Sequence, residues 1–231
     1  MKVLITGGSG RIGGGCLKQC LSHPKISTVV AFGRSSLAGE VANHPKLKQV
    51  IVKDFAKWPE DVLDAHADAA GMIWAMGSRN GRSRTADFEY ALTFLDSMGR
   101  VLESKPKRPL FKYIQLSGRF VRSDQDMKLW WGDYPRKLKG LCDTKVLEFG
   151  NSHKDSWKTS VVKPGPVGSE VVMGHRLFIA MLGTNVGILD NELGAFMTYL
   201  LVDGEGESEV TENLRMVTKG REILQAQRHA H

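Results

Sequence analysis

The stretch KVLITGGSGRIGGG, residues 2–15, places a short apolar run directly before six glycines in nine residues. Gly7, Gly10 and Gly13 have the spacing G-x-x-G-x-x-G, and glycine permits the positive φ values and the close backbone approach that a pyrophosphate needs. A helix after the turn would offer free N–H groups and the positive end of its dipole to an anion. The stretch therefore predicts a dinucleotide-binding turn; the alternative is an ordinary glycine-rich turn.

Short apolar runs with the length of buried strands recur along the chain. They cover residues 2–6, 27–32, 48–54, 71–77, 110–117 and 159–165. Segments with helical spacing lie between them, at 16–21, 59–67, 85–102 and 136–149. Because parallel strands need crossover connections, this alternation predicts an α/β fold with a doubly wound parallel sheet of the Rossmann type.

The pattern changes after Gly165, where the sequence predicts helices near 175–183 and 191–202, a strand at 214–218 and a last helix at 220–227. These elements are too few for an independent domain. We therefore expect a single NAD(P)-binding domain over residues 1–231. Residues 166–231 would contribute a small substrate cap over the carboxyl ends of the strands, where an open α/β sheet binds its ligand.

Composition narrows the classes of partner. The formal net charge is +7, but lysine and arginine are scattered rather than gathered in one tract, so nucleic acid is not an expected partner. No apolar run approaches about 18 residues and no signal peptide is evident, so we expect no membrane contact and a cytoplasmic location. Histidine and cysteine spacings predict no metal site. The expected partner is a small-molecule substrate, and a homodimer is an open alternative to a monomer.

The residues after the second strand favour NADP over NAD. Arg34 and Ser35 stand where an acidic residue would bind the ribose 2′-hydroxyl of NAD. Arg11 lies within the glycine turn, and a 2′-phosphate suits both guanidinium groups, although either arginine alone would be interpreted as an exposed charge. Asp54 and Phe55 close the third strand and predict a contact with the adenine edge; the alternative for Asp54 is a helix N-cap or turn.

Six motifs follow one another as ITGGSGRIG, AFGRSS, KDF, IWAMGS, YIQLSG and VVKPGPVG, over roughly residues 1–170. In this order the chain resembles the short-chain dehydrogenase/reductase superfamily. In detail it looks most like the atypical branch, with the Tat-interacting-protein-type oxidoreductases and the NmrA-like proteins. The cofactor contacts expected from the turn, the strand ends and this resemblance are Gly7, Gly10, Arg11, Ile12, Gly13, Arg34, Ser35, Asp54, Phe55, Gly77, Lys139, Pro164 and Gly165.

The resemblance also implies a serine and a Tyr-x-x-x-Lys pair as catalytic residues. Ser117 in QLSG matches the serine; the alternative is a strand-end serine bonded to the local backbone. Lys139, followed one turn later by Asp143, matches the lysine, but the position of the tyrosine holds Pro135. Tyr134 is the nearest tyrosine and the expected acid/base catalyst. Pro135 suits the first helical turn and would leave Tyr134 just outside the helix, in an extended conformation.

Together these features predict an NADP(H)-dependent oxidoreductase for a medium-sized, largely apolar or aromatic carbonyl or alcohol. Trp130, Trp131 and Tyr134 lie where the substrate pocket of the family would open, and aromatic side chains there suit such a substrate. Two alternatives stay open. One is a non-redox isomerase or cyclase on the same scaffold, motivated by the displaced tyrosine. The other is an NADP-sensing binding protein whose occupancy alters its association with a protein partner.

Overall fold

The computed structural model describes residues 1–78, 81–105 and 109–229. Within these ranges a parallel sheet of seven strands has the order β3-β2-β1-β4-β5-β6-β9. Its strands are β1 (Lys2–Thr6), β2 (Thr28–Gly33), β3 (Leu47–Ile51), β4 (Gly71–Trp74), β5 (Phe111–Leu116), β6 (Trp157–Lys163) and β9 (Val210–Glu212). The first six have the strand order of a Rossmann fold, so the predicted α/β fold is confirmed.

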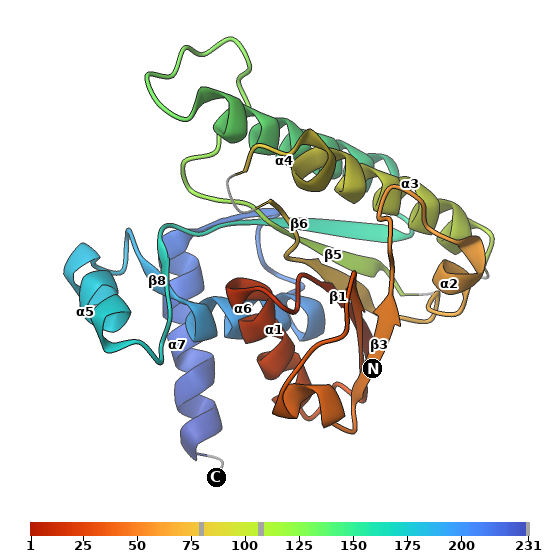
Figure 1. Ribbon diagram of the computed structural model, residues 1–231, viewed down its shortest axis with the longest axis horizontal. Helices are drawn as coiled ribbons and strands as arrows, with labels where there is room; N and C mark the ends of the chain where they lie inside the picture. The colour runs from red at the N-terminus through yellow and green to blue at the C-terminus, as the bar shows by residue number, and fades with distance from the viewer. Residues whose placement is uncertain (79–80, 106–108, 230–231) are drawn as a thin grey trace.

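Helices cover both faces of the sheet (Figure 1). One face packs against α2 (Glu60–Asp64), α3 (Tyr90–Glu103) and α4 (Asp133–Ser152). The other packs against α1 (Arg11–Ser22), α6 (Asp190–Val202) and α7 (Asn213–His229). Two short turns complete this set, the 3-10 turn η1 (Glu40–Asn43) and the π turn η2 (Thr85–Glu89). Near the C-terminal end lie α5 (Met173–Leu182) and a second sheet of two strands, β7 (Val167–Gly168) and β8 (Ile188–Leu189).

The central strands are apolar on both sides because each face is buried by helices. In β1, Leu4 belongs to the core under α3 and α4, while Val3 and Ile5 belong to the core under α1 and α6. This alternation fixes the register of the strand. A one-residue slip would exchange the two sets of side chains between two differently shaped cores.

The strand predicted at 214–218 is wrong. These residues belong to α7, and the last strand of the sheet is instead β9. The buried residues of α7 are Asn213, Met216, Val217 and Gly220, whose intervals of three and four residues are those of one helical face. The run at 214–218 was therefore too short to show its helical period, which appears only over the longer stretch 213–220.

Residues 166–231, expected to cap the strands, divide into two parts. Helices α6 and α7 cover a face of the sheet, and α6 is buried along most of its length. Its close packing on α1 depends on two glycines, since a Cβ on Gly194 would lie 2.8 Å from backbone atoms of Gly15. Helix α5 stands off from the body at the left of Figure 1. A capping role for α5 stays a prediction.

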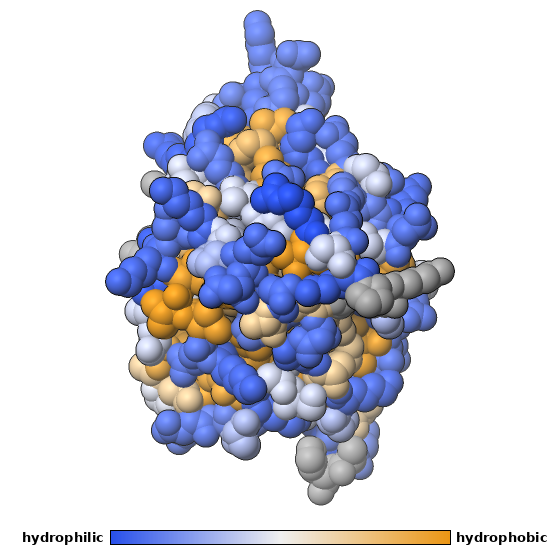
Figure 2. Space-filling view, turned by 90° about the vertical axis from the view of Figure 1, so that its right-hand side faces the viewer, coloured by the Kyte–Doolittle hydropathy of each residue, from blue (hydrophilic) through white to orange (hydrophobic). Residues whose placement is uncertain are grey.

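The side of the molecule drawn in Figure 2 carries mainly hydrophilic residues, with apolar ones scattered among them.

No helix in the described ranges is both long and apolar enough to cross a membrane. The three cysteines are buried and unpaired.

Candidate functional site

The glycine turn brings the start of α1 against the end of β1. Gly7 has a φ of 73°, and a Cβ there would lie 2.5 Å from the carbonyl oxygen of Ala75. A Cβ on Gly13 would lie 2.1 Å from the carbonyl oxygen of Gly7. The Gly10 N–H donates to that same oxygen over 2.8 Å, and α1 begins at Arg11. Backbone N–H groups at this helix start have no partner within the helix, so they are available to bind an anion.

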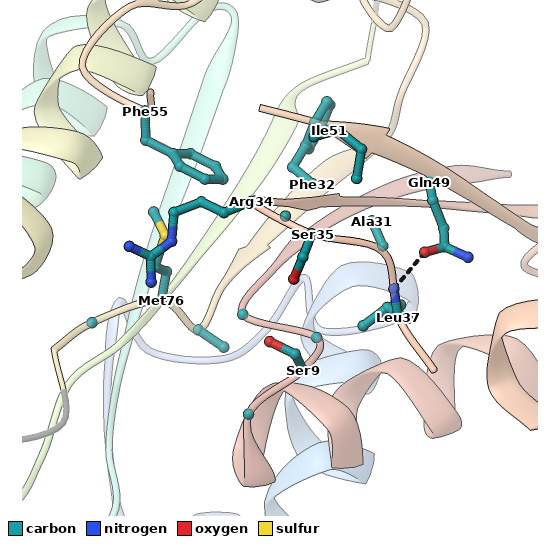
Figure 3. Close-up of a pocket in the computed structure, with 16 residues that line it drawn as sticks. Ser9, Ala31, Phe32, Arg34, Ser35, Leu37, Gln49, Ile51, Phe55 and Met76 are labelled. Atoms are coloured by element: carbon teal, nitrogen blue, oxygen red, sulfur yellow. Dashed lines mark hydrogen bonds between the residues drawn. The ribbon is translucent and has the colours of Figure 1, made fainter. Parts of the chain in front are cut away.

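A pocket opens beside this turn, along the carboxyl ends of β1 to β4 (Figure 3). Six of the predicted cofactor residues line it: Gly7, Gly10, Arg34, Ser35, Phe55 and Gly77. The carboxyl edge of an open parallel sheet, where its strand order reverses, is the usual ligand site of such folds. The structure thus brings together residues from four separate segments of the chain.

Arg34 carries the only charge among the described residues that line this pocket. In Figure 3 its side chain lies between Phe55 and Met76, while the hydroxyl groups of Ser9 and Ser35 point toward each other. The loop after β2 is held by Leu37, whose N–H donates to Gln49 Oε1 over 2.7 Å. A pocket with a helix start, two hydroxyl groups, a guanidinium and apolar walls fits a phosphorylated dinucleotide.

Several other predicted cofactor residues lie outside this pocket. Arg11 and Lys18 line a neighbouring hollow that shares part of the glycine turn with this pocket. Ile12 packs against the core under α1, and Gly13 is buried in the helix. The carboxylate of Asp54 is exposed and accepts a hydrogen bond from the Ala56 N–H over 3.0 Å, which is the turn geometry of the alternative interpretation. An adenine contact of Asp54 stays a prediction.

Pro164 and Gly165 follow β6 and join two distant segments. The Pro164 carbonyl accepts a hydrogen bond from the Arg119 N–H over 2.8 Å. The Gly165 N–H donates to Asn213 Oδ1 over 2.8 Å, and a Cβ at this position would lie 1.7 Å from the carbonyl oxygen of Val186. Packing alone therefore requires glycine at position 165, whatever the cofactor contact.

A second cluster of polar groups lies at the ends of β5 and β6. Ser117 follows β5, and its Oγ donates to Asp143 Oδ2 over 2.6 Å. The Nζ atom of Lys163, the last residue of β6, lies 3.9 Å from the same oxygen. Asp143 comes from α4, one turn after Lys139, so the two side chains share a helix face. The cluster therefore brings together side chains from the ends of β5 and β6 and from α4, between positions 117 and 163.

Asp143 is 1 % exposed, and its second oxygen, Oδ1, has no hydrogen-bond partner among the described residues. Burial raises the pKa of Asp143 to about 6 from its ordinary 3.8. The hydrogen bond from Ser117 and the charges of Lys163 and Lys139 act in the opposite direction. Burial is the larger effect, so this carboxyl group takes up a proton far more readily than an exposed aspartate.

Tyr134 lies inside α4 rather than just before it, which corrects the expected extended conformation. Gly132, with a φ of 60°, turns the chain into a helix that begins at Asp133. Pro135 is then the third helical residue, where a backbone N–H would have no helical partner. Tyr134 is 50 % exposed and precedes Asp143 by nine residues, about half a turn away around the helix. The structure therefore brings Ser117 to Asp143 and leaves Tyr134 on another side of α4.

The aromatic residues before α4 form a small exposed cluster. Trp130 is 93 % exposed, Trp131 packs edge-on to Phe120 at 6.2 Å between ring centres, and the Arg136 guanidinium lies 4.7 Å from the Trp131 ring centre. These contacts hold the segment after Ser117 near the start of α4. A role for the cluster in binding substrate stays a prediction.

Sequence reasoning left out several residues that the structure places in these sites, among them Lys163 and Met76. The only sign of Lys163 in the sequence is its position, a lysine at the end of a predicted buried strand and directly before Pro164. Met76, beside Gly77 in the pocket wall, carried no chemical signal. No cluster of three or more histidine, cysteine, aspartate or glutamate side chains that could hold a metal ion occurs in the described part of the chain.

No model of a protein family matches the chain. Among curated proteins, it is similar to LysW-L-2-aminoadipate/LysW-L-glutamate phosphate reductase of Saccharolobus solfataricus, with 23% identity over 183 residues. The match takes in 78% of this chain and 46% of the reductase, so the chain spans about half the length of this relative.

Solved structures share the fold across nearly the whole chain. A short-chain dehydrogenase from Burkholderia cenocepacia in complex with NADP has a TM-score of 0.64 and 15% identity, covering 99% of this chain and 94% of that one. An oxidoreductase from Lactococcus lactis has a TM-score of 0.62 and 18% identity, covering 97% of each chain. A dTDP-glucose 4,6-dehydratase from Bacillus anthracis in complex with NAD has a TM-score of 0.64 and 14% identity, covering 97% and 81%. These likenesses confirm the Rossmann-like fold.

Proposed function

We propose that this chain is an NADP(H)-dependent oxidoreductase of the short-chain dehydrogenase/reductase type, in its atypical branch. Its substrate is a medium-sized, largely apolar or aromatic carbonyl or alcohol. The observation that supports the proposal most is the pocket in which the glycine turn and Arg34 meet at the carboxyl edge of the sheet. Neighbours of the same fold in complex with NADP and NAD add support.

The residues have separate roles in this proposal. The turn at Gly7 and Gly10 and the start of α1 bind the pyrophosphate, and Arg34 with Ser35 binds the 2′-phosphate. When bound, the nicotinamide supplies or accepts a hydride. Ser117 then holds the substrate oxygen, and Lys139 contacts the cofactor ribose. Pro164 and Gly165 pass the nicotinamide in this assignment, and Tyr134 is the acid/base residue carried over from the family.

Cofactor binding and turnover test the proposal in two steps. Titration calorimetry with NADPH and NADH should give a lower Kd for NADPH, because Arg34 pairs with a phosphate that NADH lacks. The protein is then incubated with NADPH and a panel of aromatic and aliphatic ketones and aldehydes, and NADPH oxidation is followed by absorbance. Reduction of at least one carbonyl is expected. No NADPH binding would contradict the cofactor assignment, and binding without turnover would favour the NADP-sensing alternative.

A non-redox isomerase or cyclase is the second candidate. The observation that favours it is the separation of Tyr134 from Ser117, because the usual tyrosine is the proton donor of the redox reaction. Product formation from an unsaturated or cyclisable substrate without any nicotinamide would support this candidate. A strict requirement for NADPH would exclude it.

A further inference from the structure

The geometry points to Ser117 and Asp143 as a proton relay, in which Ser117 exchanges a proton with the substrate oxygen and Asp143 exchanges one with Ser117. The inference rests on the proposed function. It assigns to Asp143, in place of Tyr134, the acid/base task that a tyrosine performs in the related enzymes. In this chain Pro135 occupies the position of that tyrosine. Asp143 acts through Ser117, so it is a positioning and proton-storing residue behind the hydroxyl group.

The contact between the two side chains is short and enclosed. Ser117 Oγ and Asp143 Oδ2 are 2.6 Å apart, in the range of hydrogen bonds to an ionised acceptor. Ser117 is 7 % exposed at the carboxyl edge of the sheet, and Asp143 behind it is 1 % exposed. A proton that reaches the Ser117 hydroxyl group therefore has one short hydrogen bond through which to reach a buried carboxylate.

The second oxygen of Asp143 argues against a purely structural role. Oδ1 is buried and has no hydrogen-bond partner among the described residues, which is costly for a carboxylate in an apolar interior. A carboxyl group kept only for stability would be expected to satisfy both oxygens. A group that must alternate between charged and neutral forms gains from incomplete hydrogen bonding, because neither form is then strongly favoured.

The groups that face Asp143 come from four elements: Lys139 and Cys142 on α4, Lys163 on β6, Tyr113 on β5 and Asp87 at η2 beyond Cys142. The two lysines favour the carboxylate. Burial raises the pKa of Cys142 to about 12 and that of Tyr113 well above its ordinary value, so neither loses a proton near neutral pH. The pKa of Asp143, about 6, leaves it able to give or take a proton there.

The proton balance closes in both directions. During carbonyl reduction the substrate carbon gains a hydride, and the oxygen, as it becomes negative, takes the proton of the Ser117 hydroxyl. The O–H bond of neutral Asp143 breaks, and its proton replaces the one on Ser117 Oγ. Asp143 is left as a carboxylate that solvent reprotonates before the next turnover. Alcohol oxidation runs the same transfers in reverse and requires the ionised carboxylate at its start.

Titration of the free protein tests the pair without cofactor or turnover. With aspartate labelled at the carboxyl carbon, the ¹³C NMR signal of Asp143 is the one that Asp143→Asn removes. Its midpoint is expected near pH 6, and Ser117→Ala should raise that midpoint, because the hydroxyl group stabilises the carboxylate. Lys163→Met should shift it in the same direction. A midpoint near the ordinary 3.8, or one that Ser117→Ala leaves unchanged, overturns the relay.

Steady-state pH profiles test the relay in turnover. For carbonyl reduction, kcat of the wild type should fall as pH rises through about 6, since the neutral carboxyl is required. Asp143→Asn should lower kcat about 100-fold and remove this step, with the Kd for NADPH unchanged. Asp155→Asn, an exposed aspartate beyond the end of α4, is the matched control and should keep the wild-type profile.

The outcomes separate the relay from the proposed function. If the wild type reduces carbonyls but the pH step persists in Asp143→Asn, or is lost in Tyr134→Phe, the relay is wrong and the oxidoreductase assignment stands. If the wild type binds NADPH and reduces nothing, the proposed function fails, and the relay fails with it. If Asp143→Asn does not fold, as judged by loss of NADPH binding, Ser117→Ala is measured in its place. A wild-type kcat in Ser117→Ala would then count against the relay.

Discussion

A Cβ atom on Gly13 would lie 2.1 Å from the carbonyl oxygen of Gly7, so α1 reaches the glycine turn only because position 13 lacks a side chain. Gly13→Ala should therefore push the helix away from the turn. We expect a loss of about 1 to 3 kcal/mol in the free energy of unfolding, as for overpacked cores. NADPH affinity should fall at least about tenfold, because the N–H groups at the helix start move away from the phosphates. Urea denaturation and calorimetry measure the two effects.

Gly174→Ala is the control for this substitution. Gly174 lies in α5, and a Cβ there would meet no atom within 4 Å. Alanine is the better helix former, so stability should stay equal or rise by up to about 1 kcal/mol, with no change in NADPH affinity. Equal losses in the two variants would contradict the packing argument.

Removing the charge at position 34 should change cofactor preference rather than stability. Arg34 is exposed in the pocket wall, where no acidic residue lies among the described lining residues. Charged hydrogen bonds contribute about 1.5 to 3 kcal/mol, so Arg34→Ala should weaken NADPH binding about 10- to 100-fold and leave NADH binding nearly unchanged. Calorimetry with both cofactors measures this, with Arg100→Ala on the exposed side of α3 as control. An equal loss for both cofactors would place the 2′-phosphate elsewhere.

Asp87 should hold the loop that follows β4. Its carboxylate accepts hydrogen bonds from the N–H of Ser78 over 2.7 Å, from the hydroxyl group of Ser78, and from the N–H of Ser83 over 3.1 Å. Asp87→Ala removes the acceptor that these donors share and should cost about 2 kcal/mol in the free energy of unfolding. NADPH affinity should also fall, because Gly77 in the pocket wall adjoins Ser78. Asp96→Ala, exposed on α3, should change neither quantity in parallel denaturation and binding experiments.

The buried carboxyl of Asp143 should make stability depend on pH. Its pKa in the folded protein, about 6, lies above the ordinary 3.8 of an unfolded chain, so the folded state holds the proton more tightly. The contribution is complete below 3.8 and is lost as pH rises to about 6, a difference on the order of 3 kcal/mol. Asp143→Asn cannot ionise and should flatten this part of the profile. Urea denaturation across the range measures it, with Asp155→Asn as control; equal slopes in wild type and Asp143→Asn would show that other groups cause the dependence.

Most of the sheet could be predicted because each strand is a short apolar run and each crossover helix has a local period. The six expected strands appear as β1 to β6, with bounds that differ by up to three residues. Residues 214–218 show the limit of this reasoning. The five residues from Leu214 to Thr218 are compatible with the period of a strand and with that of a helix. Met216 and Val217 pack into the core under α6, and this packing favours the helix.

The sequence by itself determined the Rossmann-like fold and the glycine turn, since both follow from backbone rules that act over a few residues: where glycine is required, where a strand ends and where a helix begins. The tertiary structure decided which side chains meet. Ser117, Asp143 and Lys163 come from three elements, and their contact depends on how α4 lies across β5 and β6. Tyr134 is close to Lys139 in sequence, but the rotation of the helix turns it away, because each residue advances about 100° around the axis.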